Sequence, residues 1–189
     1  MGERPPGTFK SGLEIVREQL LDKMIDQLGD NDELTIWSFA ETHQQNLPPT
    51  RGKLLKNGEG RQDFENRVTD IASGGHTALH DSVLAAVRAS RAESSTPDGL
   101  TPTIIVLSDG YDTRNTLSLP QLLDRIKAEG EETPVPRVYT IGYGVTDPDR
   151  DKLANTLKAI SIATKGNFYD AKKNPVDLDR VFVDVFGHL

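Results

Sequence analysis

The chain contains no cysteine, which excludes thiol catalysis, disulfide bonds and cysteine-based zinc sites. This absence leaves the compartment open, since many proteins on either side of a membrane lack cysteine. No apolar run approaches the ~20 residues that a membrane-spanning helix needs. The first residues, Met1-Gly2-Glu3-Arg4-Pro5-Pro6, lack the apolar segment of a signal peptide, so we expect none in the chain as written.

Basic residues are also in short supply. The chain has 22 Lys and Arg residues and 29 Asp and Glu residues, which gives a net charge of -7. Nucleic acids and anionic membrane surfaces attract basic proteins, so both are disfavoured as partners. An acidic surface suits cation binding, although it more often serves solubility.

The length and composition predict one folded α/β domain. The chain has 189 residues, of which 35% are hydrophobic and 27% charged. Residues 1–10 are polar and rich in glycine and proline, and we expect a flexible segment there, followed by one domain over residues 11–189.

Apolar spacing predicts alternating helices and strands. Strands are expected at Leu34–Phe39, Ile104–Leu107, Val138–Ile141 and Gly166–Tyr169, with at most a short edge strand near Leu54-Leu55. Helices are expected from Ser11 to Gly29, around Phe64–Ile71 and Leu79–Val87, from a Ser118–Gln121 capping box to Gly130, after Asp147-Pro148, and after Pro175. This order predicts a three-layer, doubly wound, mostly parallel sheet flanked by helices. The unbroken apolar run at Ile104–Leu107 predicts a strand covered on both faces.

Two oxygen-bearing side chains are candidates for a metal site. Asp109 follows a predicted buried strand directly, and Thr77 follows Gly74-Gly75 just before a predicted helix. Ligands of parallel sheets bind beyond the carboxyl ends of the strands, and hard cations prefer oxygen donors. From the residues alone, Asp109 is equally well explained as a turn residue, and Thr77 is better explained as an ordinary helix N-cap than as a metal ligand. Asp81 is expected to interact with the helix dipole.

Two segments resemble the second and third metal-site loops of von Willebrand factor A-type domains. They are Gly74-Gly75-His76-Thr77-Ala78-Leu79-His80-Asp81-Ser82-Val83 and Ile104-Ile105-Val106-Leu107-Ser108-Asp109-Gly110-Tyr111-Asp112-Thr113. The stretches Val138–Gly144, Ile160–Ala171 and Val181–Phe186 extend the resemblance, which runs from about Ser11 to the C-terminus. They are most similar to a bacterial subgroup in which the domain follows an extracytoplasmic solute-binding-like region, which favours an extracytoplasmic parent protein.

The resemblance implies a non-enzymatic binding domain with a metal-ion-dependent adhesion site. In such domains the residues at the Thr77 and Asp109 positions help to hold Mg²⁺ or Mn²⁺, and a carboxylate of a protein or peptide ligand completes the metal shell. The first family loop, Asp-x-Ser-x-Ser, has no counterpart here, and Met1 stands about where it would end. We therefore expect an N-terminally truncated domain with weak or no metal binding; the upstream coding sequence tests this expectation.

The missing loop also implies a missing central strand. Without it, three outcomes are open: the strand beginning near Glu33 pairs directly with the one ending at Leu107, another chain supplies a strand, or the chain forms intermolecular contacts through its sheet edges.

Other sites are less well supported. His76 and His80 are four residues apart, but Thr77 stands where a zinc protease has glutamate. Asp109, Asp112 and Thr113 depart by one residue from the Asp-x-Asp-x-Thr pattern of some phosphatases. A metal-dependent hydrolase using Asp109, and a docking module for an ATPase partner, remain the alternative functions.

Overall fold

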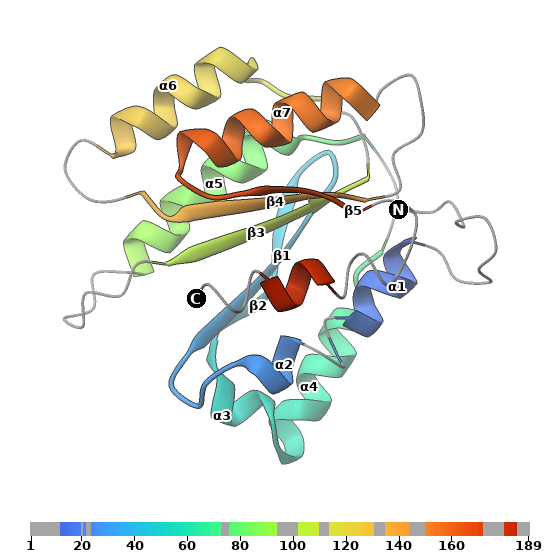
Figure 1. Cartoon of the computed structure of the whole chain (residues 1–189). Helices are drawn as coiled ribbons and strands as arrows, with labels where there is room; N and C mark the ends of the chain where they lie inside the picture. Colours follow the sequence, from blue (N-terminus) through green and yellow to red (C-terminus); the bar gives the residue numbers. More distant parts are fainter. Residues whose placement is uncertain are drawn as a thin grey trace. The chain divides into compact units, whose positions relative to one another are not determined.

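The computed structural model describes residues 12–19, 21, 24–72, 76–93, 102–109, 114–130, 135–143, 150–171 and 180–184 (Figure 1). Its contacts divide the chain into two compact units. Unit 1 comprises Met1–Gly75 and Lys173–His188, and unit 2 is formed by His76–Lys172 with Leu189. The expectation of one domain over residues 11–189 stays a prediction.

Unit 1 combines short helices with a two-stranded sheet. Its helices are α1 (Gly12–Gln19), α2 (Ile25–Gln27), α3 (Gly52–Leu55) and α4 (Gly58–Thr69). The predicted stop before Gly29 is confirmed, because Leu28 leaves the helical region with an extended backbone. Residues 180–184 are also helical, within the region predicted after Pro175. The core of unit 1 is a cluster of buried apolar side chains: Ile25, Leu28, Ile36, Leu47, Leu55, Phe64 and Val68.

The two strands of unit 1 are antiparallel. β1 (Glu33–Phe39) is the predicted strand, and it pairs with β2 (His43–Arg51), which was not predicted. The expected edge strand at Leu54-Leu55 is wrong, since both residues lie in α3 and Leu55 is buried in the core. Leucine is a good helix former, and Leu55 reaches the core from the helical turn of α3.

Two irregularities interrupt the pairing of β2 with β1, and the first of them accommodates the prolines of β2. Leu34 pairs with Thr50 and Ile36 with Leu47, so Pro48 and Pro49 together lie opposite one residue of β1. Proline has no N–H to donate, and strands tolerate it at bulges and edges. A second irregularity follows at Asn46, whose side-chain oxygen accepts a hydrogen bond from the Ser38 N–H at 2.8 Å.

Unit 2 contains the parallel sheet. Its strands are β3 (Thr103–Ser108), β4 (Arg137–Tyr143) and β5 (Phe168–Ala171), in the order β3-β4-β5. Its helices are α5 (Leu79–Glu93), α6 (Leu119–Glu129) and α7 (Arg150–Ala163). In Figure 1, α7 runs along β4 and β5, while α6 lies beside α5 and α7. The expected parallel sheet with flanking helices is confirmed.

The strands of this sheet differ in burial. β4 is buried from Val138 to Tyr143, as its central place requires. β3 was expected to be covered on both faces, but Ile104, Ile105 and Leu107 are only partly buried. Among the described strands, β3 has a neighbour on one side only, which leaves its side chains less covered than those of the central strand β4. The predicted ladder between the strand near Glu33 and the strand ending at Leu107 is absent among the described residues.

Helix α6 begins and ends as its sequence predicts. The Gln121 N–H donates to Ser118 Oγ, and the Ser118 N–H donates to Gln121 Oε1 at 2.9 Å, which completes the capping box. Gly130 follows the last turn. The predicted helix start at Asp147-Pro148 and the Gly74-Gly75 break lie outside the described residues.

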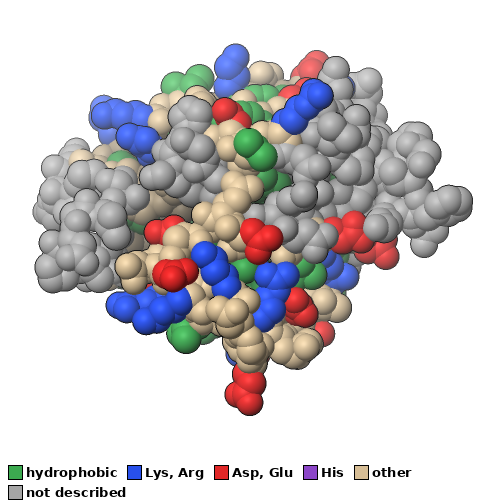
Figure 2. Space-filling view, turned by 60° about the horizontal axis from the view of Figure 1, so that its bottom comes forward, with side chains coloured by type: hydrophobic (Ala, Val, Ile, Leu, Met, Phe, Trp, Pro, Cys, Tyr) green, Lys and Arg blue, Asp and Glu red, His purple; other side chains and the backbone are tan. Residues whose placement is uncertain are grey.

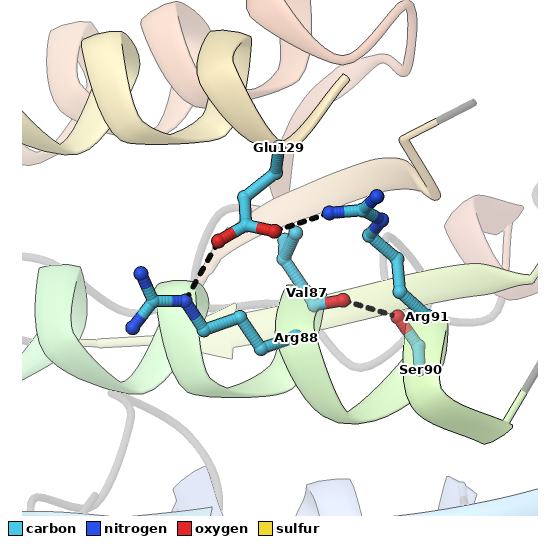
Figure 3. A network of polar contacts seen from close by, with 5 residues as sticks. All are labelled: Val87, Arg88, Ser90, Arg91 and Glu129. Atoms are coloured by element: carbon cyan, nitrogen blue, oxygen red, sulfur yellow. Dashed lines mark hydrogen bonds and ion pairs between the residues drawn. The ribbon is translucent and has the colours of Figure 1, made fainter. Parts of the chain in front are cut away.

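An ion network joins α5 to α6 (Figure 3). Arg88 Nε donates to Glu129 Oε1 at 2.9 Å, and Arg91 donates to the other carboxylate oxygen. The hydrogen bond from Arg88, with the charges of both arginines, lowers the pKa of Glu129 below its ordinary value of 4.5.

None of the described helices combines the length and apolar character needed to cross a membrane.

Candidate functional site at the start of α5

The start of α5 and the end of β3 lie at the same end of unit 2 (Figure 1). Thr77 stands two residues before the first residue of α5, and Asp109 directly follows the last residue of β3. Both side chains are partly buried. The fold thus places the two predicted site residues on segments at one end of the same unit.

The loop Arg114–Leu117 continues the chain from Asp109 towards α6, and it is held against the start of α5. The Arg114 N–H donates to the Thr77 carbonyl oxygen at 3.1 Å. The Asp81 carboxylate accepts from both the N–H and the hydroxyl of Thr116, each at 2.7 Å. The Thr77 segment and the segment that follows Asp109 are therefore fastened together.

His80 adds two further bonds to this junction. Its N–H donates to Asn115 Oδ1 at 2.8 Å, and its ring Nδ1 lies 2.8 Å from the Leu117 carbonyl oxygen. A carbonyl only accepts, so Nδ1 carries the proton in this bond. The buried ring is thus used to hold the loop, while His76 is exposed. This arrangement speaks against the zinc pair considered from the sequence.

Sequence reasoning did not find the loop-holding role of His80 and Asp81. Asp81 was assigned only to the helix dipole, yet its carboxylate makes specific bonds to Thr116. The partners are 35 residues apart in the sequence, so no local spacing signals the contact. A carboxylate in the first turn of a helix is the one hint that the sequence offers.

The donor set has the right chemistry for a hard cation but is small. Thr77 and Asp109 offer one hydroxyl and one carboxylate, both oxygen donors. Among the described residues, no group of three or more His, Cys, Asp or Glu side chains is placed to hold a metal ion. These two residues alone do not fit a tightly bound Mg²⁺ or Mn²⁺. The second acidic residue of the loop, Asp112, lies outside the described residues.

Tyr143 ends β4 at the same, carboxyl end of the parallel sheet. Its side chain is 1% exposed, and its hydroxyl has no hydrogen-bond partner in the described structure. Burial raises the pKa of Tyr143 above its ordinary value of 10.0, because the charged form loses its hydration. Tyr143 therefore stays neutral at physiological pH.

No protein-family model matches the sequence, and no curated protein matches it. Among solved structures, the chain is similar to a protein described as von Willebrand factor type A from Catenulispora acidiphila, with a TM-score of 0.66 and 19% identity. The chain has a von Willebrand factor A-type fold. The alignment covers 93% of this chain and 38% of that protein, so the chain spans about two fifths of its length.

A second solved structure supports the A-type fold. It is described as the conserved hypothetical protein BatB from Bacteroides thetaiotaomicron, with a TM-score of 0.64 and 17% identity. Here the alignment covers 98% of this chain and 93% of that protein. The fold expected from the two loop motifs is therefore confirmed.

Proposed function

We propose that this chain is a non-enzymatic binding module that engages a protein or peptide ligand at the end of unit 2 where β3 ends and α5 begins. The observation that carries the proposal is the junction between the Thr77 segment and the Arg114–Leu117 loop, fastened through Asp81 and Thr116. Such bonds pre-organise two loops that carry oxygen donors, which lowers the ordering cost of binding.

A divalent cation contributes weakly to this site. Thr77 and Asp109 would leave most of a Mg²⁺ shell to water, and a ligand carboxylate would be needed to improve the coordination. The preferred partner is therefore a protein or peptide that presents a carboxylate. The net charge of -7 argues against nucleic acid. In the view of Figure 2, acidic and basic side chains are interspersed over the described surface, which fits a protein partner better than a polyanion.

A Mn²⁺ titration followed by NMR tests the site. Paramagnetic broadening is expected to fall first on amides near Thr77 and Asp109, with half-saturation only in the millimolar range or above. Adding a short acidic peptide should strengthen the broadening. Asp109→Asn and Thr77→Val should each abolish the local effect, because the first removes the negative charge of the site and the second removes its hydroxyl.

Asp170→Asn is the matched control. Asp170 is a carboxylate near the carboxyl end of β5, where it forms an ion pair with Arg150 at 2.5 Å. Its removal should leave the broadening near Asp109 unchanged. Sub-millimolar affinity would refute the weak site, and broadening centred elsewhere would refute the assignment to Thr77 and Asp109.

A further inference from the structure

The turn between α3 and α4 contains Asn57-Gly58, the one asparagine–glycine pair of the sequence (Figure 1). Both residues are exposed. The Asn57 side chain makes no cap hydrogen bond to α4, and it has no other hydrogen bond within the part of the chain that the structure describes. By contrast, the side-chain oxygens of Asn46 and Asn115 accept hydrogen bonds from backbone N–H groups. The Asn57 amide is therefore not held in one position.

The backbone conformation requires glycine at position 58. Gly58 has a φ of +58°, a left-handed conformation that residues with a Cβ disfavour. A Cβ built on Gly58 would meet nothing within 4 Å, so the requirement comes from the backbone and not from crowding. The fold thus keeps, directly after Asn57, the residue that leaves the following backbone nitrogen most accessible.

The Gly58 nitrogen is also outside the helical hydrogen bonds. Gly58 is the first residue of α4, and the first N–H groups of a helix have no acceptor within the helix. It donates to no acceptor among the residues described. Asn66 is exposed as well, but the N–H that follows it lies inside α4, where each N–H is bound to the preceding turn. Asn57 therefore differs from Asn66 in the availability of the next nitrogen.

We propose that Asn57-Gly58 is a site of spontaneous covalent modification, at which Asn57 is converted to aspartate and isoaspartate. Hydroxide removes the proton of the Gly58 nitrogen, which attacks the side-chain carbonyl carbon of Asn57. The bond from this carbon to the amide nitrogen breaks, and that nitrogen takes a proton from water and leaves as ammonia, which regenerates hydroxide. The product of this step is a cyclic succinimide.

Water then opens the succinimide ring. Cleavage of the bond between the nitrogen and the side-chain carbon gives aspartate, whereas cleavage of the bond to the main-chain carbonyl carbon gives isoaspartate. In sum, one water is consumed and one ammonia is released. Ring closure requires rotation about the ψ of Asn57, which is 148° in the structure, and the open space around Gly58 permits this rotation.

The two products have different consequences for unit 1. Aspartate keeps the backbone unchanged and places a carboxylate at the N-terminus of α4, where negative charge is favourable. Isoaspartate adds a methylene group to the main chain. The first turn of α4 has little room for it, because a Cβ on Gly60 would already meet the Leu54 carbonyl oxygen at 2.0 Å.

The core lies on both sides of this turn. Leu55 precedes the turn and Phe64 follows it, and both are buried in the same apolar cluster. A longer backbone between them must displace one relative to the other, and close-packed cores tolerate such shifts poorly. Isoaspartate at position 57 should therefore lower the stability of unit 1, whereas aspartate should not.

Mass-spectrometric peptide mapping of the full chain, incubated at mildly alkaline pH, tests the proposal. Asn57 is expected to exchange NH for O at least about tenfold faster than the exposed Asn31 and Asn66, because neither of these is followed by glycine. Isoaspartate should be the main product, and the rate should rise with pH. The proposal is overturned if Asn57 reacts no faster than Asn31 and Asn66.

Asn57→Ser separates the modification from general ageing, because serine is a good N-cap residue but has no amide. After the same incubation, wild type should contain a population with a lower thermal midpoint, while Asn57→Ser should be unchanged. Equal losses in the two proteins would overturn the effect assigned to position 57. If Asn57→Ser does not fold by circular dichroism, Asn57→Gln replaces it, since its longer side chain closes a ring much more slowly.

Asn57→Asp, measured without incubation, is the matched control for charge. It carries the negative charge of the products on an ordinary backbone, so its thermal midpoint should equal or exceed that of fresh wild type. A midpoint as low as that of the isoaspartate-containing protein would show that charge, and not the lengthened backbone, causes the loss, and would overturn the distinction between the two products.

Discussion

The two sides of the parallel sheet are secured in different ways. Beside β5, buried hydroxyls join β4 to α7: Thr140 Oγ1 donates to the Leu157 carbonyl at 3.0 Å and lies 2.7 Å from Ser161 Oγ. On the β3 side, the apolar residues Ile104, Ile105 and Leu107 are only partly buried. The difference indicates that buried hydroxyl bonds secure the sheet on its β5 side, while apolar packing of α5 against β3 contributes most on the other side.

The strongest test of this contrast is Gly166→Ala, on the β5 side. A Cβ at this position would meet the Val138 carbonyl oxygen at 2.1 Å and its carbon at 2.6 Å, so the backbone would have to move. We expect a loss of more than about 3 kcal/mol in the free energy of unfolding, measured by urea denaturation.

Gly142→Ala is the control for this variant. Its Cβ would meet Leu157 and Phe168 side chains at 3.5 and 3.6 Å, which are ordinary contacts. The expected cost is below about 1 kcal/mol. If both substitutions lowered the free energy of unfolding equally, the close approach of Gly166 to the Val138 carbonyl would not be what secures β4 to the end of α7.

A smaller effect is expected for Thr140→Val, which keeps the shape of the side chain but removes its hydroxyl. The buried Ser161 hydroxyl loses a partner, and the cost should be about 1 to 2 kcal/mol. Thr103→Val is the counterpart on the β3 side, where the Thr103 hydroxyl makes no hydrogen bond among the described residues. That change should stay within about 0.5 kcal/mol. If Thr103→Val lowered the free energy of unfolding more than Thr140→Val, the contrast between the two sides of the sheet would be wrong.

The smallest effect concerns the ion network on the β3 side, where α5 lies against β3. Glu129→Gln removes the charge that Arg88 and Arg91 share, and the free energy of unfolding at neutral pH should fall by about 1 kcal/mol or less. The lowered pKa of Glu129 sets the pH dependence: the contribution is complete above pH 4.5 and is lost as the pH falls through the lower, folded-state value. Wild type and variant should therefore converge in acid; a constant difference down to low pH would contradict the ionic origin.

Apolar periodicity predicted most of the regular structure. Leu153, Leu157 and Ile160 recur at helical spacing, and all three are buried in α7. β2 was missed because its irregularities destroy the alternation: Leu47 and Thr50 pair with residues two apart on β1 although they are three apart themselves. A pattern of period two cannot detect such a strand.

The candidate site was predictable only in part. The residue types and positions of Thr77 and Asp109 suggested oxygen donors at the end of a parallel sheet. The bonds between Asp81 and Thr116, and between His80 and Leu117, are tertiary contacts between distant segments and have no local signature. Sequence therefore indicated the candidate donors but not the bonds that hold their loops.

The prolines of β2 affect where the chain tolerates insertions and deletions. Removing one residue from a regular strand sends every later side chain to the opposite face. Because Pro48 and Pro49 share one position opposite β1, deleting Pro49 would remove this irregularity, and Ile36 would still lie beside Leu47. Such a chain should fold with the Leu47 side chain still buried, whereas deleting Trp37 should abolish folding; thermal unfolding of the two deletion variants would distinguish them. Changes of chain length in unit 1 are thus expected to accumulate at this pair of prolines.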